Sequence, residues 1–97
     1  MRETYYHPLV PSEVRKFVRY YEERSTSIAD QFWSELKEAI DYATLHPERH
    51  HFDDSGRRRC NLKRFPFHFL FRAYPDKIRV TVIRHNHQKP SFGIKRN

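Results

Sequence analysis

The sequence predicts an α+β fold in which a pair of helices covers one face of a mainly antiparallel β-sheet. Apolar residues recur with the helical period of about 3.6 in the first half of the 97-residue chain, and with the strand period of about 2 in the second half. The polar segments between these elements are short, which favours packing between neighbours in sequence. We therefore predict the order β-α-α-β-β-β in a single domain over residues 1–97.

The N-terminal region predicts a short strand followed by a helix. Residues 3–7, ETYYH, are expected to form the strand, which the prolines after it bring to an end. A helix then opens at the Pro-Ser-Glu segment with Ser12 as its cap and Glu13 in its first turn. Its apolar stripe comprises Val14, Phe17, Val18 and Tyr21.

A second helix is predicted from about Ile28 to Leu45, and Ser25 both ends the first helix and caps the second. Its buried stripe comprises Ile28, Phe32, Leu36, Ala39, Ile40 and Ala43, and Trp33 widens it. Pro47 stops this helix, and residues 48–56 form a polar loop. Two amphipathic helices joined by a few polar residues are expected to pack as an antiparallel hairpin.

Three strands are predicted in the second half, over Arg59–Leu62, Phe67–Tyr74 and Ile78–His85, with connections short enough for antiparallel hairpins. Alternation assigns their faces. The face toward the helices comprises Cys60, Leu62, Phe67, Phe69, Phe71, Ile78, Val80 and Val82. The opposite face is expected to be uncovered and to carry Arg59, Asn61, His68, Leu70, Arg72, Tyr74, Arg79, Thr81, Ile83 and His85.

Positive charge is concentrated in the second half of the chain. Residues 1–56 have a Lys/Arg against Asp/Glu balance of −4, whereas residues 57–97 have a balance of +11, with Asp76 as their one acid. An evenly mixed surface of this net charge would serve solubility alone. Segregation of this degree favours a surface that faces a polyanion, such as nucleic acid, an anionic membrane or an acidic protein.

Several classes of protein are disfavoured by composition. The single cysteine, Cys60, allows no internal disulfide and suggests a reducing compartment. No apolar run has the length of a membrane span and no signal peptide is recognisable, so we predict a soluble, cytoplasmic protein with no membrane partner. The histidine clusters lack the cysteine or carboxylate spacing of a zinc site, and no glycine-rich phosphate loop exists. We expect no metal and no cofactor.

The segment RHNHQKP, Arg84–Pro90, follows the most apolar strand and combines cations, imidazoles and amides. These groups suit phosphate contact, and they also suit metal-free RNA cleavage, in which histidine can act as acid or base. A solvated strand end that binds a partner is an equally good interpretation. In the final segment SFGIKRN, Phe92 and Ile94 either anchor a partner or pack back onto the sheet.

The whole chain resembles the RelE/ParE superfamily of toxins from bacterial type II toxin–antitoxin (plasmid stabilisation) modules. The resemblance is carried by the helix VPSEVRKFVRYYEERS, a second helix ending in LHPE, the strand pair RRCNLKRFPFHFLFRAY and the final VIRHNHQKP. It implies a small single domain without a cofactor. It also implies neutralisation by a cognate antitoxin that is acidic, partly disordered until bound, and wraps the toxin with a helix and an extended segment.

Two activities divide that superfamily, and the resemblance implies one of them here. RelE-like members are ribosome-dependent mRNA endonucleases; by position, Arg59, Lys63, Arg72 and Arg84 would hold phosphate, and His85 or His87 would transfer protons. ParE-like members inhibit DNA gyrase and are not nucleases. The nucleases commonly carry a tyrosine near the C-terminus, whereas no tyrosine follows Tyr74 here, and a phenyl ring such as that of Phe92 cannot donate a proton.

This departure favours the ParE-like branch. Arg84–Lys89, the segment after it and the uncovered sheet face are the expected surface for gyrase or the antitoxin, with these further residues as contacts: Arg57, Arg58, His68, Arg79, Lys89, Phe92 and Arg96. A ribosome-dependent mRNA endonuclease is the alternative. A non-toxic nucleic-acid-binding module that only uses the basic face is a third possibility.

Overall fold

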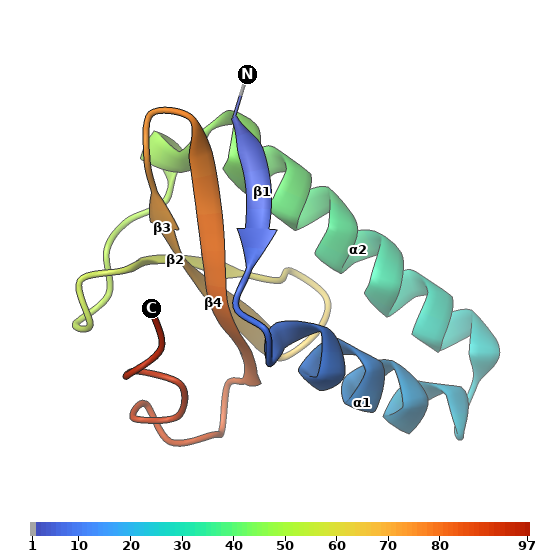
Figure 1. Cartoon of the computed structure of the whole chain (residues 1–97). Helices are drawn as coiled ribbons and strands as arrows, with labels where there is room; N and C mark the ends of the chain where they lie inside the picture. The colour runs from blue at the N-terminus through green and yellow to red at the C-terminus, as the bar shows by residue number, and fades with distance from the viewer. Residues whose placement is uncertain (1) are drawn as a thin grey trace.

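The computed structural model describes residues 2–97, and it confirms the predicted element order (Figure 1). The elements are β1 (Glu3–Tyr6), α1 (Val10–Glu22), α2 (Thr26–Leu45), the 3₁₀ turn η1 (Pro47–Arg49), β2 (Arg58–Asn61), β3 (Phe67–Ala73) and β4 (Lys77–His85). The sheet order is β1-β4-β3-β2, with β1 parallel to β4 and the other pairs antiparallel. The two helices cover one face of this mixed sheet, as the periodicity predicted. Neither helix has the length and apolarity needed to cross a membrane.

Helix α1 begins earlier than predicted and without a side-chain cap. Leu9 occupies the cap position, and the Ser12 hydroxyl lies inside the first turn, where it donates to the Leu9 carbonyl (2.8 Å). The prediction of Ser12 as the cap was therefore wrong. Pro11 lies in the first turn, where its fixed φ and missing N–H suit a helix start without a capping oxygen.

Helix α2 begins at Thr26, and the predicted cap is confirmed because the Ser25 hydroxyl accepts from the Ile28 N–H (3.2 Å). Its central stripe is buried as expected, at Phe32, Leu36, Ile40 and Ala43. Ile28 and Trp33 were assigned wrongly, since they are 41% and 49% exposed. Ala29 is buried in place of Ile28, because its small side chain fits where α1 and α2 approach each other.

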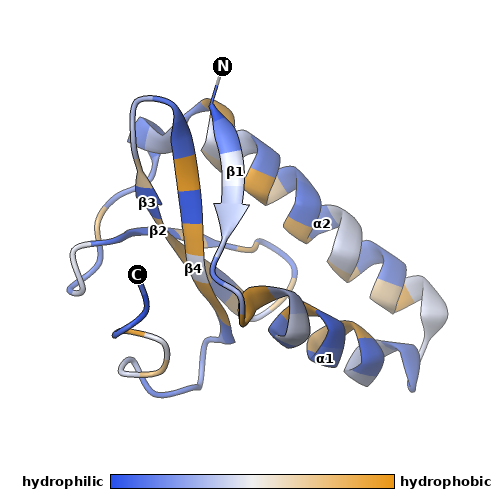
Figure 2. Cartoon of the chain, in the orientation of Figure 1, coloured by the Kyte–Doolittle hydropathy of each residue, from blue (hydrophilic) through white to orange (hydrophobic). Residues whose placement is uncertain are grey.

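An aromatic cluster joins both helices to the sheet. Phe67 of β3 packs against Phe17 of α1, with ring centroids 4.6 Å apart, and against Phe32 of α2 at 5.0 Å. Tyr21 and Phe65 close the cluster at 5.3 Å from each other. Figure 2 shows the apolar segments of the helices and of β4 that supply this core. Tilted and edge-on ring pairs of this kind add to the stability that burial supplies.

A β-bulge in β4 reverses part of the predicted face assignment. Phe71 pairs with Val80 but Leu70 pairs with Val82, so Thr81 is an extra residue without a partner in β3. Beyond it, Ile83 joins the core under the helices, and the His85 ring packs edge-on against Phe67. The predicted faces of Val82, Ile83 and His85 were therefore wrong. Simple alternation cannot anticipate a residue that shifts the register by one.

Replacing Phe32 by alanine should lower the free energy of unfolding by about 3–5 kcal/mol, because it empties a fully enclosed site in the aromatic cluster. The matched change at its neighbour, Trp33→Ala, should cost less than about 1 kcal/mol because half of that side chain is in water. Urea denaturation followed by circular dichroism measures both. Equal losses in the two variants would contradict the described packing of α2.

Candidate functional site

The face of the sheet away from the helices, called the far face, carries six of the residues predicted to be functional. Arg57 lies one residue before β2, and extending the strand register by that residue would place it beside Arg72, whose charge acts on it. The register lays three rows of side chains across this face: Arg57, Arg72 and Arg79 at one end, Arg59, Leu70 and Val82 in the middle, and Asn61, His68 and Arg84 at the other. Both end rows carry cations, and the middle row is apolar at Leu70 and Val82 but begins with the cation Arg59.

Residues 86–97, called the tail, cross the far face from one end to the other (Figure 1). At the first end, Arg84 Nη1 donates to the carbonyl oxygens of Pro90 (2.8 Å) and Phe92 (2.7 Å). In the middle, Gly93 lies against Val82 with a φ of +76°, and a Cβ there would come within 2.7 Å of a Val82 methyl group. Only glycine fits both this backbone conformation and this contact.

The other end of the tail is held in the same way. Arg57 Nη2 donates to the carbonyl of Ile94 (2.7 Å) and to that of Arg96, and Arg79 Nε donates to the carbonyl of Asn97 (2.7 Å). Arg96 itself turns inward, forming an ion pair with Glu13 of α1 (2.7 Å). The arginines of the sheet therefore bind the tail through its main chain, and the Arg96 side chain adds a further contact to α1.

The prediction that the far face is uncovered was wrong. Leu70 is completely buried, and Arg57, His68 and Arg84 are 2%, 2% and 3% exposed. These three polar groups were expected to face solvent. Burial of such groups is tolerated where acceptors lie within hydrogen-bonding distance, as they do for Arg84, for His68 and for Nη2 of Arg57.

His68 connects Arg84 to the start of the tail. Arg84 Nε donates to His68 Nε2 (2.8 Å), and His68 Nδ1 lies 2.7 Å from Asn86 Oδ1. Because a guanidinium can only donate, Nε2 must be unprotonated and Nδ1 must carry the proton, which makes the imidazole neutral. Burial lowers the pKa of His68, and the charges of Arg59 and Arg84 lower it further, against the opposing effects of Asn86 and Asp53.

The two predicted proton-transfer residues lie at the end of β4 and not on the far face. The His85 and His87 rings are stacked, with centroids 5.1 Å apart. The His87 N–H donates to His85 Nδ1 (3.1 Å), and the His85 N–H donates to Gln88 Oε1 (2.7 Å). His85 is half-buried beside Phe67, whereas His87 is exposed. Nε2 of His85 is then the protonated nitrogen of the neutral ring.

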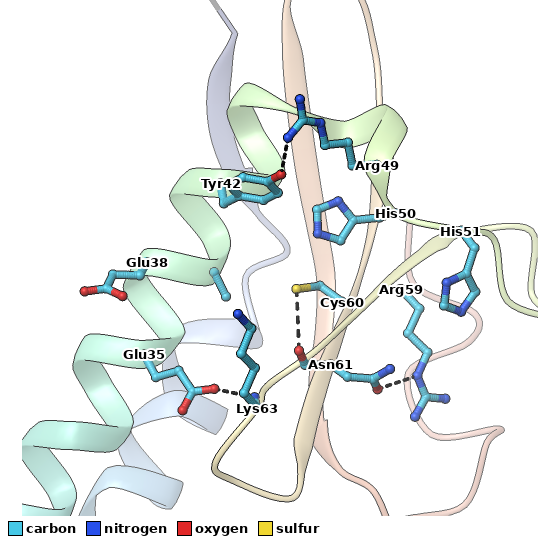
Figure 3. A pocket seen from close by; sticks show the side chains of 11 residues that line it. Glu35, Glu38, Tyr42, Arg49, His50, His51, Arg59, Cys60, Asn61 and Lys63 are labelled. Atoms are coloured by element: carbon cyan, nitrogen blue, oxygen red, sulfur yellow. Dashed lines mark hydrogen bonds between the residues drawn. The ribbon is translucent and has the colours of Figure 1, made fainter.

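A separate cleft of about 680 Å³ lies between α2, η1 and β2 (Figure 3). In Figure 3, Cys60 and Lys63 point toward α2, whereas Arg59 and Asn61 extend to the other side of β2. Arg59 and Lys63, two groups that were predicted to hold a phosphate, both line this cleft, but their side chains extend in different directions. His50 also lines this cleft, and its Nδ1 has no hydrogen-bond partner within residues 2–97.

The cleft offers no activated nucleophile at Cys60. Burial and the nearby charge of Glu35 raise the pKa of this thiol to about 11, so it stays protonated near neutrality. Glu35 serves the β2–β3 turn, where its carboxylate accepts from the main-chain N–H groups of Lys63 and Arg64. The prediction that Cys60 is a core residue is confirmed.

The remaining predicted contacts are divided between the two faces of the sheet. Arg58 pairs with the core residue Phe71, so its side chain lies on the helix-facing side. Arg58 donates to the His50 carbonyl (2.8 Å) and covers the ring of Phe52. Lys89 is exposed, and Phe92 is 39% exposed with the Arg96 guanidinium 5.3 Å from its ring centre.

Sequence reasoning gave no functional role to three residues on which this arrangement depends. Gly93 was recognisable as one of only two glycines in the chain. Asn86 lies in the segment Arg84–Pro90, which was predicted to be functional, but the sequence does not show that Asn86 pairs with His68. Glu13 carried no signal of its pairing with Arg96, because 83 positions separate them and only the folded chain brings them together.

No three His, Cys, Asp or Glu side chains in the part of the chain that the structure describes are grouped as a metal ion would require. In comparisons with known proteins, no protein-family model matches the sequence, and no curated protein matches it either.

Replacing Arg84 by methionine should cost about 2–4 kcal/mol in the free energy of unfolding, because it leaves two tail carbonyls and His68 without their buried donor. Amide hydrogen exchange at Phe92, Ile94 and Arg96 should accelerate as the tail loosens. Lys89→Met, which removes an exposed cation from the same segment, is the control. If both variants were equally stable and equally protected, Arg84 would not hold the tail.

We expect the free energy of unfolding to decrease as the pH falls, because of His68. Its folded-state pKa lies below the ordinary value of 6.5, so the unfolded chain binds the proton more readily. The contribution is full above about pH 6.5 and decreases as the pH falls toward the folded-state pKa. Urea midpoints between pH 7.5 and 5 should fall more steeply for the wild type than for His68→Gln.

In the His68→Gln variant, the remaining dependence of the urea midpoint on pH includes a contribution from His7. Partial burial lowers the pKa of His7, and the charges of Arg96 and Arg79 lower it further. Trp33→Ala supplies the control, because it changes an exposed side chain without a titratable group and should keep the wild-type slope. A His68→Gln slope equal to that of the wild type would contradict the neutral, buried imidazole.

Proposed function

We propose that the protein is the toxin of a bacterial type II toxin–antitoxin module, of the ParE-like branch of the RelE/ParE superfamily. It acts in the cytoplasm by binding DNA gyrase through protein contact, and it uses no cofactor. The α+β element order, with a helical hairpin on one face of the sheet, supports the superfamily resemblance. The basic second half suits neutralisation by an acidic antitoxin that orders on binding.

The observation that carries the gyrase proposal is the way in which the tail is held. Its carbonyl oxygens bind to Arg57, Arg79 and Arg84, while Phe92 and Ile94 are 39% and 37% exposed. A main chain that is already ordered loses less conformational entropy when its side chains bind a partner. The tail thus presents two apolar side chains and Lys95 on a prearranged backbone, which suits binding to a protein better than chemistry on a substrate.

A groove beside the tail enlarges this surface. It has a volume of about 610 Å³ and lies between the tail and the segment that joins β1 to α1. Leu9, which is half-exposed, and Ile94 supply apolar walls, and Arg79 and Lys95 supply cations. An apolar centre with a charged rim is the usual composition of a protein-binding surface.

The mRNA endonuclease receives less support from the geometry. Phosphate cleavage requires cations and proton-transfer groups around one position. Here Arg84 is buried, with Nη1 bonded to the tail and Nε bonded to His68. Arg59 and Lys63 extend in different directions, and the stacked imidazoles of His85 and His87 lie at the end of β4. Without rearrangement of the tail these groups do not surround a common phosphate.

A DNA supercoiling assay with purified gyrase tests the proposal. The wild-type chain should inhibit supercoiling, and the double variant Phe92→Ser, Ile94→Ser should need at least about tenfold more protein, since loss of two apolar contacts at an interface costs more than about 1.4 kcal/mol. The control is Ile28→Ser, which changes an apolar residue of similar exposure on α2. Equal inhibition by all three proteins would exclude the tail as the gyrase contact.

A DNA-free translation reaction started from purified mRNA distinguishes gyrase inhibition from ribosome-dependent mRNA cleavage. Intact message together with inhibited gyrase is the expected result. New ribosome-dependent 5′ ends would overturn the gyrase assignment in favour of the endonuclease. Salt-sensitive binding to nucleic acid, with neither activity and no growth arrest on expression, would overturn the toxin assignment itself.

A further inference from the structure

Arg57 is buried with two donor nitrogens that no group within the described part of the chain satisfies. Its side chain is 2% exposed, and Nη2 binds the Ile94 and Arg96 carbonyls of the tail. Its Nε and Nη1, however, have no hydrogen-bond partner within residues 2–97. Leaving charged donors unpaired in the interior costs several kcal/mol, so such groups in folded proteins normally have an acceptor.

The surroundings of Arg57 are cationic. The strand register places Arg79 opposite Arg72, and Arg57, one residue before β2, lies close enough for the charge of Arg72 to act on it. Side chains opposed in this way approach within about 5 Å at Cβ, and like charges there repel. Burial lowers the pKa of Arg57, and the charges of Arg72 and Arg84 lower it further.

The nearest acid does not neutralise this row. Asp53 raises the pKa of Arg57 through its charge, but its carboxylate accepts hydrogen bonds from the N–H and hydroxyl of Ser55 in the preceding turn. Arg57 forms no ion pair with it. One carboxylate also cannot balance three guanidinium groups, so positive charge remains in excess beside the unpaired nitrogens.

We propose that this row binds one small oxyanion of the phosphate class between Arg57 and Arg72, beneath the end of the tail. A tetrahedral oxyanion on the Arg72 side supplies an acceptor for one of the free nitrogens of Arg57 and neutralises Arg72 at the same time. Arg72 is half-buried, so the site opens to solvent on its side. The bound anion then stabilises the closed tail, because Arg57 binds both. This inference does not depend on the gyrase proposal.

Phosphate-dependent stability of the full chain tests the site. Inorganic phosphate, added at constant ionic strength with sodium chloride, should raise the melting temperature saturably by about 5 °C or more. The ³¹P resonance of inorganic phosphate should broaden when the protein is added. A melting temperature that rises linearly with phosphate concentration, without broadening of the ³¹P resonance, would reflect the general stabilising effect of an excluded salt. That result would overturn the proposal.

Arg72→Gln is the critical variant, because the half-buried Arg72 can be replaced without removing the bonds from Arg57 to the tail. It should lose the saturable part of the phosphate effect. Arg15→Gln removes the same charge from an exposed position on α1 and should keep that effect. Equal responses of the two variants would contradict a site at this row, even if the wild type binds phosphate.

The same phosphate chemistry occurs in free phosphate and in a nucleic-acid backbone. A short single-stranded oligonucleotide, titrated into the phosphate-bound protein, distinguishes the two sources. Return of the sharp ³¹P line of free phosphate would assign the site to backbone phosphate, which requires the tail to open. An unchanged broadened line would assign it to the free anion. Either result is consistent with an oxyanion site at this row. Failure of the phosphate proposal would not change the expected result of the gyrase assay.

Discussion

The β-bulge at Thr81 is the constraint on which the rest of the far face depends. One extra residue in β4 turns Ile83 into the core and Arg84 onto the opposite side, where the tail crosses the sheet. In an unbulged strand, Arg84 would point at the apolar helices, where a guanidinium has no acceptors. The bulge thus places Arg84, a basic residue in a hydrophobic strand, where it donates hydrogen bonds to the tail.

Polar bonds hold the tail where apolar burial would be the more usual means. Gly93 packs against Val82, but Phe92 and Ile94 stay partly in water, and arginines bonded to carbonyl oxygens supply most of the other contacts. Each such bond contributes only about 1–3 kcal/mol and disappears when the segment opens. The tail should therefore open more easily than the aromatic core, and its side chains are available to a partner in either state.

The basic residues have two roles, in stabilising the fold and in creating the surface field, and composition alone does not distinguish them. Arg57, Arg79, Arg84 and Arg96 bind the tail or α1, so their charges serve the fold. Lys63, Arg64, Lys89 and Lys95 are exposed and create the field that a polyanion or an acidic partner would meet. A count of basic residues therefore overestimates the surface charge of this domain.

The sequence by itself determined the element order, the helical hairpin, the cap at Ser25 and the residues of the aromatic core, because hydrophobic periodicity and capping are local properties. It also indicated Arg84–Pro90 as a functional segment. Only the tertiary structure decided that the far face is covered, that His68 and Arg84 are partners, and that Arg59 and Lys63 diverge. The reason is that a one-residue bulge, a glycine contact and a pairing across 83 positions are relations between segments, which no local pattern encodes.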